Sequence, residues 1–241
     1  MLTVDNISVR RGVSTTLQDI SFSLTPGRTL AVVGESGAGK STLINAILGL
    51  VRCSAGRVSW SGALVSQCRP ALVMQEPRAA FNPRLSLRRS VMEPVVGRKL
   101  AVNANQLETL CHALEVQPDL LDRRPDEVSI GQAQRMGILR ALVVAPPLVL
   151  FDEPLSALDA VTQKHTARLI ADMQAQEGFA ALIVTHDLGY AAAFADEIAV
   201  LRAGRIQEIA SAQAFIEAPQ TGYGRTLRDA AFALGALERV A

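Results

Sequence analysis

The chain has 241 residues, with 24 Lys plus Arg against 23 Asp plus Glu and a formal net charge of +1. This balance gives no electrostatic reason to expect a nucleic acid as partner. A hydrophobic content of 49% with 20% charged residues is that of a globular core, not of a disordered or fibrous chain, and the length allows one large domain with or without an insertion.

Neither a secreted nor a membrane-spanning chain is expected. Three cysteines, Cys53, Cys68 and Cys111, form no CxxC pair, and their odd number argues against a disulfide framework or a zinc site. The first ten residues contain an early Asp and no apolar core, unlike a signal peptide. The longest apolar stretch, 141–151, is broken by two prolines and is shorter than the roughly 20 residues of a membrane helix.

In chain order, three strand-like segments come first: LTVDNISV, LQDISFSL and RTLAVVG (28–34). A Gly-rich turn, a helical stretch (KSTLINAILGL) and two more strand-like segments (GRVSW and ALVMQ) follow. Prolines and helical patches then fill the middle. Strand-like segments return at PLVLFDEP, AALIVTHD, EIAVLRAG and RIQEIA, and the 205–241 end is Ala-rich and expected to be helical.

Strands alternating with helices on both sides of the middle segment predict an α/β fold with a mostly parallel, covered sheet. We expect 1–75 and 146–241 to form this core and 76–145 to be a helical insertion in it.

A phosphate-binding loop is indicated by GESGAGKS (34–41), which matches G-x-x-x-x-G-K-[ST] between a predicted strand and a predicted helix. Its glycines let backbone N–H groups surround phosphates, Lys40 would reach the β- and γ-phosphates, and Ser41 would ligate Mg²⁺. A Gly-rich turn without a ligand is the alternative, and the flanking strand and helix argue against it. The predicted nucleotide-binding residues are Gly34, Glu35, Ser36, Gly37, Ala38, Gly39, Lys40, Ser41 and Thr42.

Catalytic side chains are expected where two later strands end. The apolar run before Asp152 predicts a buried strand that delivers this carboxylate to the ligand edge of the sheet, where it would hold Mg²⁺. Glu153 can face the attacking water as base or water-positioner. His186 leaves a second strand, expected beside the first, and would contact the γ-phosphate. The alternatives are surface acids at a strand end and a structural histidine.

A second helix start occurs at VSIGQ (128–132), where Ser129 is a predicted N-cap and Gln132 its capping-box partner. The chain thus has a second helix start in addition to the one at the phosphate loop.

In this order the motifs resemble the ATP-binding cassette (ABC) ATPases, the motor subunits of ABC transporters. The resemblance covers nearly the whole chain: Walker A at 34–41, Q-loop at Gln75, signature at 128–132, Walker B at LVLFDE, D-loop at SALD (156–159) and switch histidine at His186. It implies a RecA-like P-loop core with a mixed sheet, an N-terminal antiparallel β subdomain and an inserted α-helical subdomain.

The resemblance also implies ATP and Mg²⁺ as cofactors, with Gln75 joining Ser41 and Asp152 at the metal. Two cassettes, identical or different, would pair head to tail, so that Ser129, Gly131 and Gln132 act at the nucleotide held by the partner's Walker A loop. Asp159 of the D-loop is also expected to bind nucleotide. At two positions the sequence departs from the family pattern in a way expected to affect nucleotide binding. Ile130 replaces the first signature glycine, and Arg11 stands where an aromatic would stack on adenine, so discrimination of ATP from GTP would be modest.

MQEPRAAFNP (74–83) and APQTGYGRTL (218–227) resemble segments of the oligopeptide and nickel importer group. This implies membrane permease subunits, a substrate-binding protein acting indirectly, and a peripheral place on the cytoplasmic face of the inner membrane. A peptide, nickel or a metal chelate would be the substrate. Gln75, Glu76 and residues around Phe81 would line the groove for the permease, with core packing as the equal alternative for Phe81.

Three rival classes fit less well. A DNA-repair ATPase would carry a long coiled coil in place of the Pro-interrupted insertion, a translation factor would hold two cassettes, and a P-loop kinase gives no role to VSIGQ or SALD. A soluble ABC-type ATPase that is not coupled to transport remains the alternative.

Overall fold

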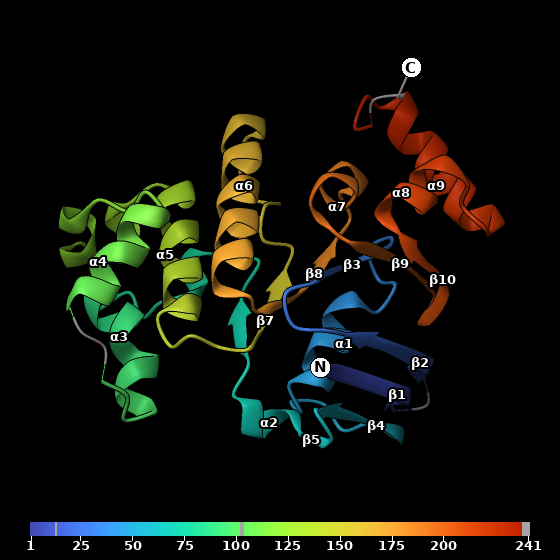
Figure 1. Cartoon of the computed structure of the whole chain (residues 1–241), viewed down its shortest axis with the longest axis horizontal. Coiled ribbons are helices and arrows are strands. Elements are labelled where there is room, and N and C mark those ends of the chain that lie inside the picture. The colour runs from blue at the N-terminus through green and yellow to red at the C-terminus, as the bar shows by residue number, and fades with distance from the viewer. Residues whose placement is uncertain (13, 102–103, 238–241) are drawn as a thin grey trace.

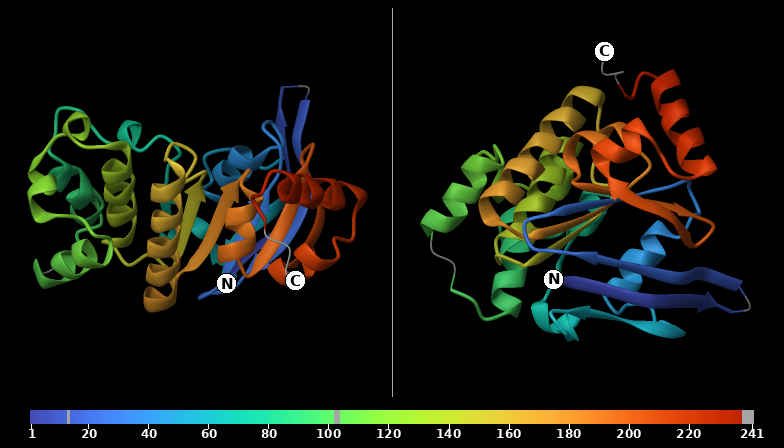
Figure 2. Two further views of the ribbon diagram at one scale, coloured as in Figure 1. Left: turned by 90° about the horizontal axis from the view of Figure 1, so that it is seen from above. Right: turned by 45° about the vertical axis from the view of Figure 1, so that its right-hand side comes forward.

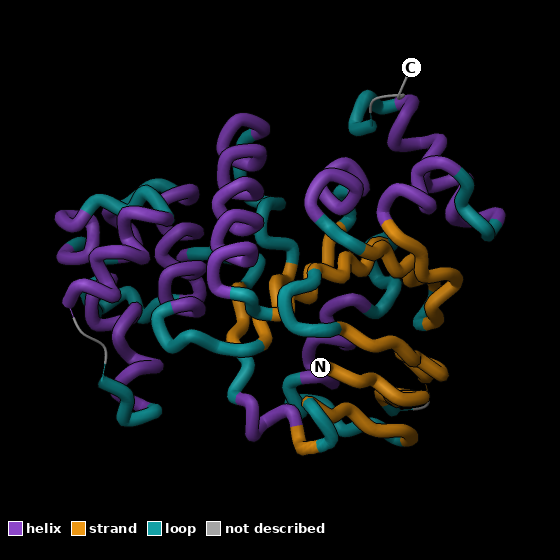
Figure 3. Tube along the Cα trace, in the orientation of Figure 1, coloured by secondary structure: helices purple, strands orange, loops and turns teal. Residues whose placement is uncertain are grey.

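The computed structural model describes residues 1–12, 14–101 and 104–237. Its larger sheet has the strand order β10-β9-β3-β8-β7-β6 (Figures 1 and 3). All neighbours in this sheet are parallel except β9 and β10, which form an antiparallel hairpin. The expected α/β fold with a mostly parallel sheet is therefore confirmed. The strands are β3 (Thr29–Val33), β6 (Ala71–Val73), β7 (Leu148–Asp152), β8 (Ala180–Thr185), β9 (Glu197–Arg202) and β10 (Arg205–Ser211).

A second sheet is antiparallel, with the order β2-β1-β4-β5. It consists of β1 (Leu2–Arg11), β2 (Ser14–Leu24), β4 (Ala55–Trp60) and β5 (Ala63–Leu64), and the short α2 (Val65–Cys68) follows it. Residues 20–24 of β2 alternate between buried and exposed, as expected of a strand with one covered face. The covered side packs in one apolar cluster with α1 (Lys40–Ile47) and with Leu30 and Val32 of β3.

Both faces of the central strand β3 are covered, because its side chains alternate between two clusters. Leu30 and Val32 share a cluster with α1, whereas Ala31 and Val33 pack with helices on the other face of the sheet. Figure 2 shows α1 and these helices on opposite sides of the sheet. These helices are α7 (Leu188–Phe194), α8 (Ala212–Glu217) and α9 (Gly222–Ala233). β3 therefore ends, and the phosphate loop begins, in the middle of the molecule.

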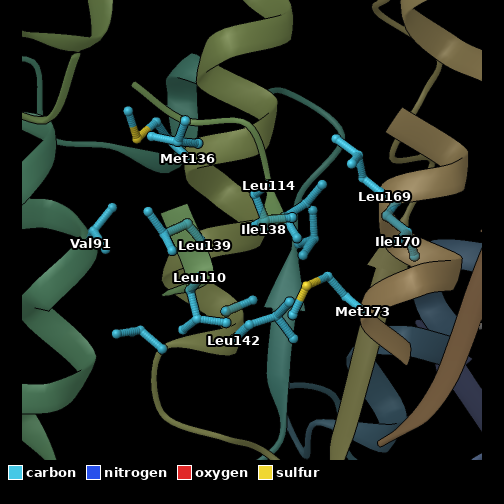
Figure 4. Close-up of a cluster of buried hydrophobic side chains, with 14 of the residues drawn as sticks. Val91, Leu110, Leu114, Met136, Ile138, Leu139, Leu142, Leu169, Ile170 and Met173 are labelled. Carbon is cyan, nitrogen blue, oxygen red and sulfur yellow. The ribbon is translucent and has the colours of Figure 1, made fainter. Parts of the chain in front are cut away.

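A helical segment lies between β6 and β7, which are neighbours in the sheet. It contains α3 (Leu87–Gly97), α4 (Ala104–Ala113) and α5 (Ile130–Leu142), with 3₁₀ turns at Arg78–Ala80, Pro118–Asp122 and Pro125–Glu127. Its apolar core is continuous with α6 (Ala160–Glu177): Leu139 and Leu142 share a cluster with Leu169 and Met173 (Figure 4). No helix in the described ranges combines the length and the hydropathy of a membrane crossing.

The C-terminal helices are attached to the sheet by a buried carboxylate. Glu208 of β10 is only 6% exposed. Its Oε2 accepts from the backbone N–H groups of Gln220 (2.6 Å) and Thr221 (3.1 Å), and its Oε1 accepts from the Thr221 hydroxyl (3.0 Å). Glu208 therefore satisfies the backbone where the chain turns into α9.

Glu208→Gln is expected to destabilise the fold, because one carboxylate oxygen becomes an amide donor that faces other donors. Leaving such buried groups unpaired costs about 1–3 kcal/mol. Urea denaturation of the wild type and the variant measures the difference in unfolding free energy. The conservative replacement of the exposed Glu217 by Gln is the control and should stay within about 0.5 kcal/mol. Equal midpoints for Glu208→Gln and the wild type would contradict the role of this carboxylate.

Candidate functional site

The phosphate loop is held in shape by backbone contacts as much as by its glycines. Gly39 caps α1 with φ at 110°, in the region that favours glycine. A Cβ on Gly34 would collide with the carbonyl oxygen of Leu201, at the end of β9. The neighbouring strand thus fixes the first residue of the loop, and α1 fixes its last.

Lys40 ties the two ends of this loop together. Its Nζ donates to the carbonyl oxygens of Gly34 (2.8 Å) and Glu35 (3.1 Å), and it lies 3.6 Å from Oε1 of Glu153. The side chain is only 7% exposed. A buried ammonium with these partners presents positive charge at the centre of the loop, where phosphates need it.

Ser41 and Asp152 bring two oxygen ligands together. The Ser41 hydroxyl donates to Oδ1 of Asp152 over 3.3 Å, joining the first turn of α1 to the end of β7. Burial raises the pKa of Asp152, and the Ser41 hydrogen bond opposes this. No group of three or more His, Cys, Asp or Glu side chains suited to a metal occurs within the described ranges. A hydroxyl and a carboxylate suit Mg²⁺, which commonly takes its other ligands from phosphates and water.

Glu153 contacts three other predicted site residues, Lys40, Gln75 and His186. It adopts φ of 45°, a left-handed conformation that is uncommon for residues other than glycine, and its N–H donates to Val184 O of the next strand (2.9 Å). Its Oε2 lies 3.0 Å from Nδ1 of His186 and accepts from Nε2 of Gln75 at 3.4 Å. The carboxylate, 17% exposed, therefore links the end of β7 to Gln75 and His186.

All of these polar side chains except that of Asp152 line one cavity of about 700 Å³. Its lining includes most of the predicted loop together with Gln75, Glu153 and His186. β7 and β8 are adjacent, with Asp152 opposite Val184, which confirms that the strands leading to Glu153 and His186 lie side by side. Cavity size, positive charge and oxygen ligands together suit a nucleotide with its metal.

The remaining predicted residues lie elsewhere. A separate hollow of about 450 Å³ is lined by Ser129, Ile130, Gly131, Gln132 and Asp159, among others. Ser129 and Gln132 form the predicted capping box: Ser129 N donates to Gln132 Oε1 (2.8 Å), and Gln132 N donates to Ser129 Oγ (3.2 Å). Asp159 caps α6 by accepting from the N–H groups of Val161 and Thr162, and the hydrogen bonds of Thr162 lower its pKa.

Two further expectations have different outcomes. Phe81 is 5% exposed and packs in the core, with the Arg140 guanidinium 5.8 Å from its ring centre, so the core alternative holds for this residue. Arg11 ends β1, and its side chain lies outside the described part of the structure.

Sequence reasoning missed Thr16, which lines the cavity, and Leu201, whose carbonyl oxygen lies against Gly34. Neither belongs to a motif, and no local pattern marks them.

Comparison with known proteins decides the family. The model of the family described as ABC transporter matches residues 17–156. The chain belongs to the ABC transporter family. It is therefore an ATPase that binds ATP, and the expected P-loop fold with its antiparallel sheet and helices is confirmed.

Curated relatives cover most of the chain. It is 35% identical over 227 residues to a Brucella ovis protein named as a peptide import ATP-binding protein, covering 89% of this chain and 72% of that one. The oligopeptide transport ATP-binding protein OppF of Escherichia coli is 32% identical and is matched over 88% of this chain and 67% of its own length. Among solved structures, cbiO1 from Clostridium perfringens superposes with a TM-score of 0.81 at 22% identity, over 97% of this chain and 95% of that one.

Proposed function

We propose that this chain is the ATP-hydrolysing subunit of a peptide importer that works through separate permease subunits. The observation that supports hydrolysis most strongly is Glu153, whose carboxylate faces Lys40, Gln75 and His186 in the cavity of the phosphate loop. A carboxylate in this place positions and polarises the attacking water. The names of the relatives, peptide import and oligopeptide transport, support peptides over nickel or a metal chelate.

Each part of the cavity then has a role in phosphoryl transfer. The N–H groups of 34–41 surround the phosphates, and Lys40 neutralises the β- and γ-phosphates. Ser41 and Asp152, with Gln75, would hold Mg²⁺, which would supply positive charge against the phosphate oxygens. Glu153 receives the proton of water, and His186 fixes the Glu153 carboxylate and contacts the γ-phosphate.

Two separate hollows favour a pair of cassettes. Lys40 lines one hollow and Ser129 the other. We propose that Ser129, Gly131, Gln132 and Asp159 complete the site of a second cassette placed head to tail, with 76–145 as the helical subdomain that carries the signature and 1–75 with 146–241 as the core. One solved structure similar in fold, at 24% identity, is described as a dimeric cassette bound to ADP and Pi.

A groove for the permease is available beside the Q-loop. A cavity of about 270 Å³ between β6, α3 and α5 is lined by Met74, Pro94, Arg98 and Arg140, among others. Met74 is 44% exposed, and Gln75 and Glu76 follow it. We propose that a permease segment docks here and couples Gln75 to the membrane subunits. The chain would then sit on the cytoplasmic face of the inner membrane, and a substrate-binding protein would deliver the peptide.

Uptake of a labelled peptide tests this proposal. Cells that lack the chain should lose uptake, and the wild type but not Glu153→Gln should restore it. Labelled nickel run in parallel tests the other substrate class. Unchanged peptide uptake alongside Mg²⁺-dependent ATP hydrolysis by the purified chain would favour the soluble ATPase instead.

A further inference from the structure

Tyr223, in the first turn of α9, lies beside the phosphate loop. It packs against the cluster that contains Ala31 and Val33 of β3, the strand that leads into the loop. Its ring centre is 4.4 Å from Cζ of Arg202, which directly follows Leu201, the residue in contact with Gly34. These two contacts place the aromatic ring beside β3 and the end of β9, the strands that lead into the loop and hold its first residue.

The Tyr223 hydroxyl faces an acidic group of the loop. It is buried, and no described residue gives it a hydrogen bond of normal geometry. Burial raises the pKa of Tyr223, the Glu35 carboxylate raises it further, and Arg202 opposes them. Tyr223 therefore remains a neutral donor beside a carboxylate, and a hydrogen bond to a charged acceptor is among the stronger ones available to it.

The ring is held in place independently of the loop. Thr221 Oγ1 accepts from Gly224 N (3.0 Å), and Thr221 is itself bound by the buried Glu208. A Cβ on Gly224 would collide with the Glu208 carboxylate, so this turn of α9 packs tightly on β10. A tyrosine fixed in this way can transmit the position of α9 to a neighbouring loop.

We propose that Tyr223 is a positioning residue for ATP binding: its hydroxyl donates to the Glu35 carboxylate and fixes the second residue of the phosphate loop. The carbonyl oxygen of that residue accepts from Lys40 Nζ, so the position of Glu35 sets that of the phosphate-binding ammonium. The inference rests on the proposed function, because it requires the loop to bind ATP. It gives a role to the GYG segment, which the hydrolytic mechanism does not use.

The test measures Kd for Mg²⁺-ATP by titration, and KM and kcat by phosphate release. Tyr223→Phe keeps the ring over Arg202 and removes the hydroxyl. It should raise Kd and KM about tenfold and leave kcat within about twofold. The unfolding temperature, measured alongside, checks that the variant is still folded. Tyr190→Phe is the matched control: its hydroxyl is also buried without a normal hydrogen bond among the described residues, but on α7, and should not change Kd.

A double-mutant cycle tests the route through Glu35. In a Glu35→Ala background, Tyr223→Phe should cause no further loss of affinity. Wild-type Kd in Tyr223→Phe, a tenfold loss that persists in the Glu35→Ala background, or an equal loss in Tyr190→Phe would each overturn the inference. If the wild type itself fails to bind ATP, the proposed function falls and this inference falls with it; the other three outcomes leave the proposed function intact.

Discussion

Glu153→Gln is expected to lower kcat by about 10²–10⁴, the usual contribution of a positioned acid or base, while ATP still binds. The amide keeps the size and most contacts of the carboxylate with Gln75 and His186, but it cannot accept a proton from water. It also removes the negative charge 3.6 Å from Lys40, which leaves the ammonium free to pair with phosphate. Affinity for ATP should therefore be equal or higher, and ATP-bound dimers should accumulate.

Nucleotide titration and phosphate release, measured on the same preparation, separate the two effects. Glu177→Gln is the control, because it removes an exposed carboxylate at the end of α6 that is not among the residues lining the cavity. Its kcat should match that of the wild type. Near wild-type turnover in Glu153→Gln would exclude Glu153 as the residue that positions water.

Lys40→Ala and Ser129→Arg should each abolish ATP hydrolysis alone, yet restore part of it when mixed. If Ser129 serves the partner's nucleotide, each variant damages a different half of a composite site. A mixed dimer then concentrates both lesions in one site and leaves the other intact. With random pairing of equal amounts, half of the dimers are mixed, so about a quarter of the sites become whole.

Hydrolysis by the two pure variants and by their mixture measures this recovery, and sedimentation confirms that dimers form. If the chain pairs with a different ATPase, one lesion is placed in each of the two chains. Recovery requires that Ser129 and Lys40 act at one nucleotide from opposite chains. Dimers that form without recovered activity, in both formats, would show that 128–132 does not complete a partner's site.

Local patterns allowed much of the fold and of the site to be predicted. Alternation and buried runs located all strands of the described residues except the two-residue β5. The Ser-x-x-Gln spacing gave the capping box at Ser129, because these features depend on neighbours in the sequence. Lys40, Asp152 and Glu153 were found because a loop or strand end fixes their place relative to the sheet edge.

Contacts between segments that are distant in the sequence could not be predicted from local patterns. Tyr223 and Leu201 reach the phosphate loop only through tertiary packing, and a short aromatic segment does not reveal which strand it covers. For Phe81 the sequence could not decide between lining the permease groove and packing in the core. A single apolar residue in an irregular segment belongs to no helical or strand pattern that would show which way it faces. The left-handed backbone of Glu153 and its hydrogen bond to Val184 on another strand are likewise not visible in a local pattern.

The strand order has a consequence for how the chain is made. β3, buried at all five residues, pairs with β8 and β9, and β8 begins at Ala180, roughly 150 residues later. At a synthesis rate of 5–20 residues per second, β8, the first partner of β3 in the sheet, is made roughly 8–30 s after β3. During that time the nascent chain exposes an apolar strand with unpaired backbone groups, a form prone to aggregation. The nucleotide loop that β3 supports therefore acquires its final shape late in biosynthesis, after the helical segment has left the ribosome.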